Sequence, residues 1–294
     1  MTKRQSSITA ITVLAIIAVC VIVISCIVSP AKAGTMDPLT VTILKVGKAD
    51  AIILQCQDET MIIDTGEEDD GLEVTEFLSK RNITYVDTLI ITHFDKDHVG
   101  GADTVVESVD VGQVLLPDYE GADVDYVDFI DALSRKNITP TRLDEPIEFT
   151  LGEAQVLVEP PISYEIPEGA AEFDNNFSLI TTVTHGDNKL LFTGDAEKRL
   201  IRDWLANGSA GQCDFLKVPH HGIYTTALDE LLDVVQPKYA AICSSAKHPA
   251  DDETLEALKG RGVDVLETRN GKITVISDGI NLELHQKVKK GSLI

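Results

Sequence analysis

The stretch that decides the fold is Thr92-His93-Phe94-Asp95-Lys96-Asp97-His98-Val99-Gly100-Gly101. It follows directly after the apolar segment Val86–Ile91, which predicts a buried strand. Imidazole and carboxylate groups therefore occupy four of six successive positions at a strand end, and these are the usual ligands of hydrolytic zinc or manganese sites. A polar loop in which Asp97 only caps a helix is the alternative, but the density of ligand types favours a metal site. The two glycines allow the backbone to turn tightly into a helix.

Three other segments end in residues of the same kinds. Leu190–Asp195 places a carboxylate after an apolar run, and Phe215–Gly222 places two successive imidazoles after another. Ile62–Gly66 ends an early strand at Asp64, a candidate partner that would orient a metal-bound imidazole. Loops at one edge of a rigid sheet can bring such groups together, so the sequence predicts one preorganised site.

The order HxDxDH with Gly-Gly, then Thr-Gly-Asp, then His-His-Gly resembles the metallo-β-lactamase superfamily of binuclear metallohydrolases. Within it, the chain is most similar to the hydrolase domain of ComEC-type competence proteins and their free-standing relatives. The resemblance extends from Val41 through Asp64-Thr65-Gly66 to the C-terminal strands. It implies an α/β fold, a four-layer αβ/βα sandwich over residues 39–287. It also implies two divalent ions, zinc or alternatively manganese, between the inner edges of the two sheets.

Metal-binding roles follow from this resemblance. The implied ligands are His93 and Asp95 for one ion, Asp97, His98 and His221 for the other, and Asp195 as the bridge that also holds the attacking water. The third superfamily motif normally supplies a histidine, but Asn175–Leu179 takes its place here. Asn176 is the ligand implied at this position, which leaves the first ion poor in nitrogen donors.

Catalytic roles are implied for four residues: Asp195, Asp97, His220 and His248. His221 is preferred to His220 as the ligand because the superfamily ligand immediately precedes the glycine, although the two could be exchanged. His220 then lies outside the ligand set or contacts phosphate, and His248 resembles a histidine at the rim of the family's site. The chain departs from the subgroup at Ala49 and Ile223, where Gly and Ser are common. The resemblance therefore defines the chemistry better than the substrate.

Residues 1–33 predict a membrane anchor or a signal segment. Lys3 and Arg4 precede the apolar run Ile8–Val28, which as a helix would span about 31 Å, the thickness of a bilayer core. Basic residues before the span predict a single-pass protein of the cell membrane with its catalytic domain outside the cytoplasm. Ala31-Lys32-Ala33 and Val23-Ile24-Ser25-Cys26 keep two alternatives open, a cleaved signal with a secreted protein and a lipid-anchored cysteine.

The charge balance limits the possible partners. Residues 34–294 carry 22 basic and 48 acidic side chains, a balance of −26. Nucleic-acid binding depends on Lys and Arg that displace counterions from phosphates, so an extended nucleic-acid surface is not expected. We expect a small substrate or phosphoester at one local site, and hence a phosphodiesterase-like or nuclease-like hydrolase. A catalytically inactive, metal-stabilised binding protein and a lactonase or β-lactamase are the alternatives.

The remaining sequence of residues 34–294, the body of the chain, consists of short apolar runs between amphipathic segments. Helical periodicity predicts helices over Leu72–Arg81, Val124–Lys136, Glu197–Ala206, Leu228–Val234 and Glu253–Lys259. Thirteen apolar runs between Val41 and Leu284 predict strands, with a hairpin turn at Thr184–Asn188 that would leave His185 exposed. The three cysteines of the body, which are Cys56, Cys213 and Cys243, are expected to be isolated buried thiols.

Overall fold

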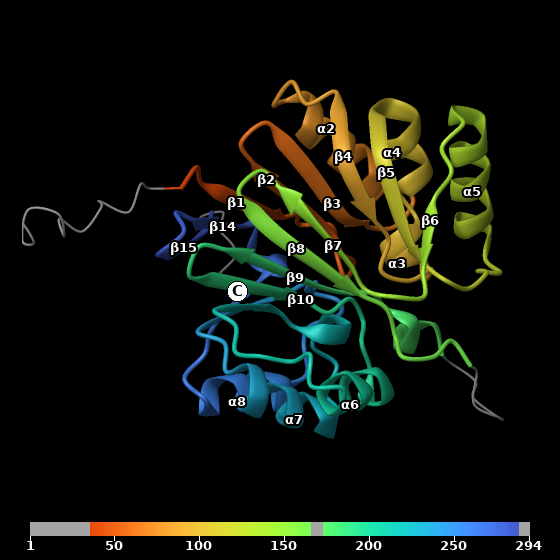
Figure 1. The fold of residues 1–294 in the computed structure, drawn as a ribbon. Helices are drawn as coiled ribbons and strands as arrows, with labels where there is room; N and C mark the ends of the chain where they lie inside the picture. The colour runs from red at the N-terminus through yellow and green to blue at the C-terminus, as the bar shows by residue number, and fades with distance from the viewer. Residues whose placement is uncertain (1–35, 166–172, 288–294) are drawn as a thin grey trace, which may run out of the picture. The chain divides into compact units, whose positions relative to one another are not determined.

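Figure 1 shows the computed structural model, which describes residues 36–165 and 173–287. The chain divides into two units, Met1–Thr35 and Met36–Ile294. The expected membrane helix at Ile8–Val28 and its two alternatives lie outside the described residues. Within the described residues, no helix is both long enough and apolar enough to cross a membrane.

The first sheet has eight strands, in the order β15-β14-β1-β2-β3-β4-β5-β6. They are β1 (Leu39–Ile43), β2 (Ala51–Cys56), β3 (Glu59–Thr65), β4 (Tyr85–Ile90), β5 (Asp110–Pro117), β6 (Thr141–Leu143), β14 (Ile273–Ser277) and β15 (Leu282–Gln286). The run from β3 to β6 is parallel, and the remaining neighbours pair antiparallel. Because β3 and β4 are parallel neighbours, their carboxyl ends lie at the same edge of this sheet.

The second sheet has seven strands, in the order β13-β12-β11-β10-β9-β8-β7. They are β7 (Ile147–Leu151), β8 (Ala154–Glu159), β9 (Ile180–His185), β10 (Asn188–Phe192), β11 (Phe215–Lys217), β12 (Tyr239–Ile242) and β13 (Asp264–Glu267). Strands β10 to β13 are parallel, so the carboxyl ends of β10 and β11 also share one edge.

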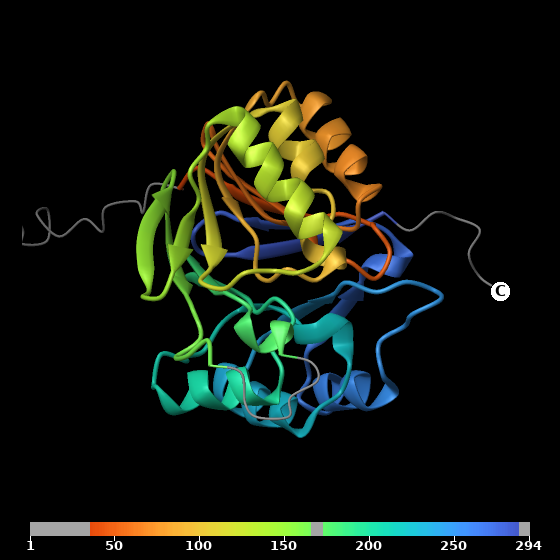
Figure 2. The ribbon, with the colours of Figure 1, turned by 90° about the vertical axis from the view of Figure 1, so that its right-hand side faces the viewer.

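Helices cover the outer face of each sheet (Figures 1 and 2). The first sheet carries α2 (Asp70–Ser79), α3 (Lys96–Val99), α4 (Ala102–Ser108) and α5 (Val124–Lys136), and the second carries α6 (Lys198–Ala206), α7 (Thr226–Val235) and α8 (Asp252–Gly260). Short 3₁₀ turns are η1 (Asp174–Phe177), η2 (Pro219–Gly222) and η3 (Thr268–Asn270). A central apolar core, with Ile63 from one sheet and Phe192 from the other, packs the two sheets face to face. The layers are therefore helix, sheet, sheet and helix, which confirms the expected sandwich.

All five predicted helices are present, and that over Val124–Lys136 has the predicted bounds. The predicted role of the two glycines was wrong. Gly100 and Gly101 have φ of −55° and −85°, which any residue can adopt. They are needed for close packing instead. A Cβ on Gly101 would lie 2.6 Å from the backbone nitrogen of Gly71 and 2.6 Å from the carbonyl oxygen of Thr65, and backbone atoms cannot move aside as the end of a flexible side chain can.

His185 also corrects a prediction. The hairpin between β9 and β10 forms as expected, with His185 paired to Asn188 across the turn. Its side chain is nevertheless fully buried, and its Nδ1 atom lies 2.8 Å from the hydroxyl of Ser277 on β14. The histidine links the two sheets, a contact that no local pattern could reveal. The three cysteines of the body are free and buried, as predicted.

Candidate metal centre

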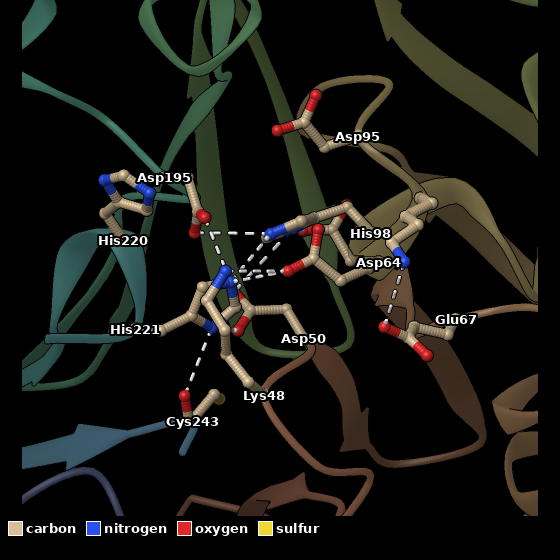
Figure 3. A network of polar contacts seen from close by, with 12 residues as sticks. Lys48, Asp50, Asp64, Glu67, Asp95, His98, Asp195, His220, His221 and Cys243 are labelled. Atoms are coloured by element: carbon tan, nitrogen blue, oxygen red, sulfur yellow. Dashed lines mark hydrogen bonds and ion pairs between the residues drawn. The ribbon is translucent and has the colours of Figure 1, made fainter. Parts of the chain in front are cut away.

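The site forms where the carboxyl ends of strands from both sheets meet. Asp64 lies near the carboxyl end of β3. His93 follows β4, Asp195 follows β10 and His221 follows β11. Figure 3 shows His98, Asp195 and His221 converging on one point from the two halves of the sandwich. The motifs that the sequence placed at separate strand ends are therefore brought together by the topology.

The centre of this cluster is a contact between two imidazoles and one carboxylate. The Nε2 atoms of His98 and His221 lie 3.3 Å apart. Asp195 places its Oδ1 atom 3.3 Å from His98 Nε2 and its Oδ2 atom 3.0 Å from His221 Nε2. Asp97 adds an oxygen 3.3 Å from His221 Nε2. One carboxylate thus faces both imidazoles, and it also groups with His93, so it lies close to ligands assigned to each of the two ions.

His93 and Asp95 lie beside this centre. Their Nε2 and Oδ2 atoms are 3.6 Å apart, and His93 groups with His98 and Asp195 as residues that could hold a metal ion. A second group of the same kind is formed by Asp97, His98 and His221, with ligand atoms within 4.8 Å of one another. These two groups share His98 and together contain five of the six motif residues, whereas Asp95 joins them only through its 3.6 Å contact with His93.

The hydrogen bonds of the imidazoles determine which nitrogen each presents to the centre. The Nδ1 atom of His221 lies 3.1 Å from the carbonyl oxygen of Cys243, which can only accept, so this nitrogen carries the proton. The Nδ1 atom of His98 lies 2.7 Å from Asp64 Oδ2 and donates to that carboxylate. In a neutral ring, each of these histidines then presents an unprotonated Nε2.

The same holds for His93. The hydroxyl of Thr92 donates to Asp64 at 2.7 Å, so its oxygen is left to accept from His93 Nδ1 at 3.1 Å. His93 Nε2 is buried and has no hydrogen-bond partner among the described residues. Asp64 thus fixes two imidazoles, one directly and one through Thr92. This confirms the orienting role expected for it.

Charge is concentrated in the cluster, and the pKa values shift accordingly. Burial alone would lower the pKa of His98 and His221, but Asp195 and neighbouring carboxylates raise both, His98 well above its usual value. Burial would raise the pKa of Asp195, but the two imidazoles and Lys217 hold it well below its usual range. Asp97 is lowered in the same way, mainly by His221 and His98. Such a set strongly favours a positive charge between its members.

Bare nitrogens that face one another across carboxylates are the donor set of a divalent metal. Imidazole and carboxylate suit zinc, and a carboxylate-rich site also suits manganese. The partnerless Nε2 of buried His93 and the close approach of the His98 and His221 Nε2 atoms are both accounted for if a cation lies between the groups. The residues present therefore fit the metal ions that the motifs imply.

Three predicted site residues lie outside the cluster. The amide oxygen of Asn176 accepts from the backbone N–H of Leu200 at 3.1 Å, and its amide nitrogen donates to Glu197 at 3.3 Å. The Asn176 side chain therefore caps the first turn of α6. His220 lies 3.4 Å from Glu197, on the far side of Asp195 (Figure 3). His248 is exposed at the rim of a cavity that His221 also lines.

Sequence reasoning missed three charged residues of the site. Lys217 and Asp50 form a fully buried ion pair directly behind Asp195, and Lys48 lies 3.1 Å from Asp97 Oδ2 at the mouth. A lysine as the last residue of the apolar strand β11 was the available signal, since burial of an unpaired lysine is costly.

The backbone is strained at the same positions. Asp64, His220 and His221 have φ of 58°, 47° and 53°, in the left-handed region that non-glycine residues seldom adopt. Gly222 continues this conformation at 82°. Strain of this kind persists where surrounding structure enforces it, and it is concentrated at functional sites.

The chain is similar in sequence to a known family and to several known proteins. A family model described as Metallo-beta-lactamase superfamily matches residues 44–246. ComE operon protein 3 of Bacillus subtilis is 27% identical over 201 residues, covering 67% of this chain and 25% of that protein. Recombination protein 2 of Haemophilus influenzae is 27% identical over 211 residues, covering 70% of this chain and 24% of that protein. The chain thus spans about a quarter of the length of these relatives, and they support the ComEC-like subgroup.

Solved structures show the same fold. Tm1679, described as a metal-dependent hydrolase of the β-lactamase superfamily, matches with a TM-score of 0.55 at 13% identity, over 80% of this chain and 98% of that one. YhfI from Bacillus subtilis, described as a metallo-β-lactamase fold protein, matches with a TM-score of 0.54 at 11% identity, over 85% of this chain and all of that one. The chain has a metal-dependent hydrolase fold and belongs to the metallo-β-lactamase superfamily.

Proposed function

We propose that the protein is a binuclear metal-dependent hydrolase that cleaves a phosphoester. The observation that carries this proposal is the fixed set of imidazoles: His93, His98 and His221 are each held through Nδ1, so that Nε2 faces Asp195 and its neighbours. A set oriented in this way is ready to take metal ions without rearrangement.

The proposed ligands are the residues that the motifs imply, and contacts among them support the set. One ion would take His93 and Asp95, the other would take Asp97, His98 and His221, and Asp195 would serve both. Zinc is proposed first and manganese second. Asn176 is not proposed as a ligand, because its amide is already bound to Leu200 and Glu197.

Two bound divalent ions would supply a water of lowered pKa and charge stabilisation for the transition state. The residues of the chain have separate tasks. Asp64 keeps the proton of His98 on Nδ1, and the carbonyl of Cys243 does the same for His221. Asp195 presents one oxygen to His98 and the other to His221. Lys48 places a positive charge at the mouth, where an anionic group of the substrate would enter.

A phosphoester is favoured by the cavity that opens beside His221. It has a volume of about 510 Å³ and is lined by the cationic side chains of Lys48 and Lys247 and by the imidazole of His248. A local group of cations suits a phosphate in a body that is otherwise strongly acidic. Asp251, Asp252 and Glu253 also line the cavity, so it is unsuited to a long polyanion. The proposal is therefore a small phosphodiester, with nuclease-like action on nucleic acid as the second candidate, favoured by the similarity to Recombination protein 2.

Replacement of Lys48 tests this recognition. Lys48→Gln should reduce kcat/KM for bis(p-nitrophenyl) phosphate by about 10- to 100-fold, because a charge-assisted contact contributes about 1.5–3 kcal/mol. Steady-state kinetics would measure the change. Lys45→Gln, an exposed lysine of the same loop, is the matched control and should retain activity. Equal kinetics of the Lys48 variant and the control would contradict a role in substrate binding.

The adjacent histidines provide a second test. His221→Ala should reduce the metal content by about one ion per chain, because His221 Nε2 faces Asp195 and Asp97. His220→Ala should retain both ions and mainly slow turnover, because His220 faces Glu197 instead. Elemental analysis of the two purified variants would measure the difference. Greater metal loss from the His220 variant would show that the ligand was wrongly assigned.

One experiment tests the function as a whole. The purified protein would be loaded with Zn²⁺ or Mn²⁺, assayed for bound metal, and screened against a phosphodiester, a phosphomonoester, a lactone and nitrocefin. Turnover of the phosphodiester alone supports the proposal, and turnover of nitrocefin or the lactone favours the lactonase or β-lactamase alternative. Two bound ions without any turnover would favour a metal-stabilised binding protein.

We also propose a location at the cell membrane, with Ile8–Val28 as the anchor and the catalytic domain outside the cytoplasm. The support is the apolar run after Lys3 and Arg4. Protease added to intact spheroplasts should digest or release the body while a cytoplasmic marker survives. Full protection of the body would overturn this topology, and a released body that begins at Gly34 would replace the anchor with a cleaved signal.

A further inference from the structure

Lys217 is a fully buried lysine at the end of β11, and the mechanism above does not use it. Its Nζ atom forms an ion pair with Asp50 from the loop between β1 and β2. It also donates to the carbonyl oxygen of Gly194 at 2.9 Å and lies 3.4 Å from Asp195 Oδ1. The three hydrogens of the ammonium group thus have three acceptors, which come from both sheets.

Two of these acceptors belong to the turn that carries the bridging carboxylate. Gly194 has φ of 50°, and in this left-handed turn its carbonyl and the Asp195 carboxylate both lie within reach of Lys217 Nζ. The Oδ1 atom that Lys217 contacts is the one that faces His98, and Oδ2 faces His221. Rotation of the Asp195 carboxylate decides which of its oxygens faces which imidazole. Lys217 therefore restrains this rotation.

The surroundings of Lys217 keep its ammonium group charged. Burial would lower its pKa, but Asp50 and Asp195 raise it well above the usual value, so the ammonium group stays charged. Asp50 in turn lies behind the imidazoles, with its oxygens 3.6 Å from His221 Nδ1 and 4.0 Å from His98 Nδ1. Stability does not require such a pair, since apolar groups of similar volume often replace buried ion pairs without loss.

We propose that Lys217 is a positioning residue, a fixed internal cation that holds Asp195 in its bridging orientation while it neutralises Asp50 beneath the centre. The proposal rests on the assignment of Asp195 as the bridge. It goes beyond that assignment because metal affinity and turnover would then depend on Lys217, a residue that touches neither the ions nor the substrate. Without the ammonium group, the carboxylate is free to rotate, and the two imidazoles lose their common partner.

The test separates positioning from simple charge balance. Asp50→Asn alone leaves Lys217 on Gly194 and Asp195, and Lys217→Met/Asp50→Asn removes both charges of the pair together. Lys217→Met alone leaves Asp50 unpaired in the interior and is at risk of unfolding, so the double variant carries the comparison. Lys217→Gln/Asp50→Asn, whose amide can still donate to Gly194, is a second version for the case in which Met does not fold. Lys238→Met/Asp214→Asn removes a peripheral ion pair of 2.8 Å on the same sheet and is the matched control.

Three quantities would be measured on each full-length protein: thermal unfolding, Co²⁺ affinity with the visible spectrum of bound Co²⁺, and kcat and KM. We expect the double variant to fold, to bind Co²⁺ about 10- to 100-fold more weakly than Asp50→Asn, and to show an altered Co²⁺ spectrum. Its kcat should fall with little change in KM. Co²⁺ affinity and spectrum equal to those of Asp50→Asn would overturn the role of Lys217. Failure of the wild-type chain to bind metal would instead contradict the proposed function.

Discussion

Asp195→Asn is expected to abolish hydrolysis while the protein stays folded. The substitution keeps the shape of the side chain but removes the charge that both His98 and His221 face. Removal of a shared ligand should disrupt both ions, and loss of several kcal/mol of transition-state stabilisation corresponds to a decrease of about 10³-fold or more in kcat. Steady-state kinetics on metal-loaded protein, with circular dichroism as the check on folding, would measure it.

The control for this variant is Asp203→Asn. Asp203 lies on α6 in a partly exposed contact of 3.7 Å with Arg199, so its neutralisation changes the net charge equally without touching the centre. Metal content gives a second readout. If the Asp195 variant retained both ions and activity within a few-fold of the wild type, the bridging assignment would be wrong.

The metal-binding motifs could be predicted from sequence because each of them is local. His93, Asp95, Asp97 and His98 follow one strand within six positions, and Asp195 and His221 each follow another. Parallel pairing brings strand ends to one edge within each sheet, and the packing of the two sheets then brings the two edges together. The candidate metal-binding groups accordingly include five of the six residues that the motifs singled out, all except Asp95.

Lys217 and Asp50 could not be predicted in the same way. They lie on different sheets, and nothing in either segment specifies that one neutralises the other. Contacts of this type depend on how the two sheets pack, which is a tertiary property. The link from His185 to Ser277 was missed for the same reason.

The position of Asn176 has a different explanation. A motif places a residue in the sequence, but competing hydrogen bonds decide where its side chain points. The first turn of α6 needs an acceptor for the backbone N–H of Leu200, and the Asn176 amide oxygen supplies it.

Edge strand β7 was not among the strands predicted from the apolar runs, because its exposed residues, such as Glu148 and Thr150, make the apolar pattern short.

Replacement of Asp64 should have the second large effect. Asp64 is fully buried and accepts from the backbone N–H of Thr92, the hydroxyl of Thr92 and Nδ1 of His98, each at 2.7 Å. Asp64→Ala leaves these donors without an acceptor, which should cost about 1–3 kcal/mol of unfolding free energy for a group that stays unpaired. Thermal or denaturant unfolding of the metal-free protein would measure the loss.

Asp64→Asn separates stability from metal binding. Asparagine tolerates the left-handed φ of 58° at this position and can still accept from Thr92. Its NH₂ group must then face either His98 or Thr92, and facing His98 it forces the imidazole proton from Nδ1 to Nε2, where the metal should bind. We therefore expect metal affinity to fall about 10- to 100-fold with a smaller loss of stability than in the alanine variant. Asp87→Asn is the control. Asp87 lies away from the centre, and its carboxylate accepts a hydrogen bond of 2.7 Å from the backbone N–H of Thr60. Metal titration curves that coincide for the wild type and the Asp64→Asn protein would show that this carboxylate does not set the state of His98.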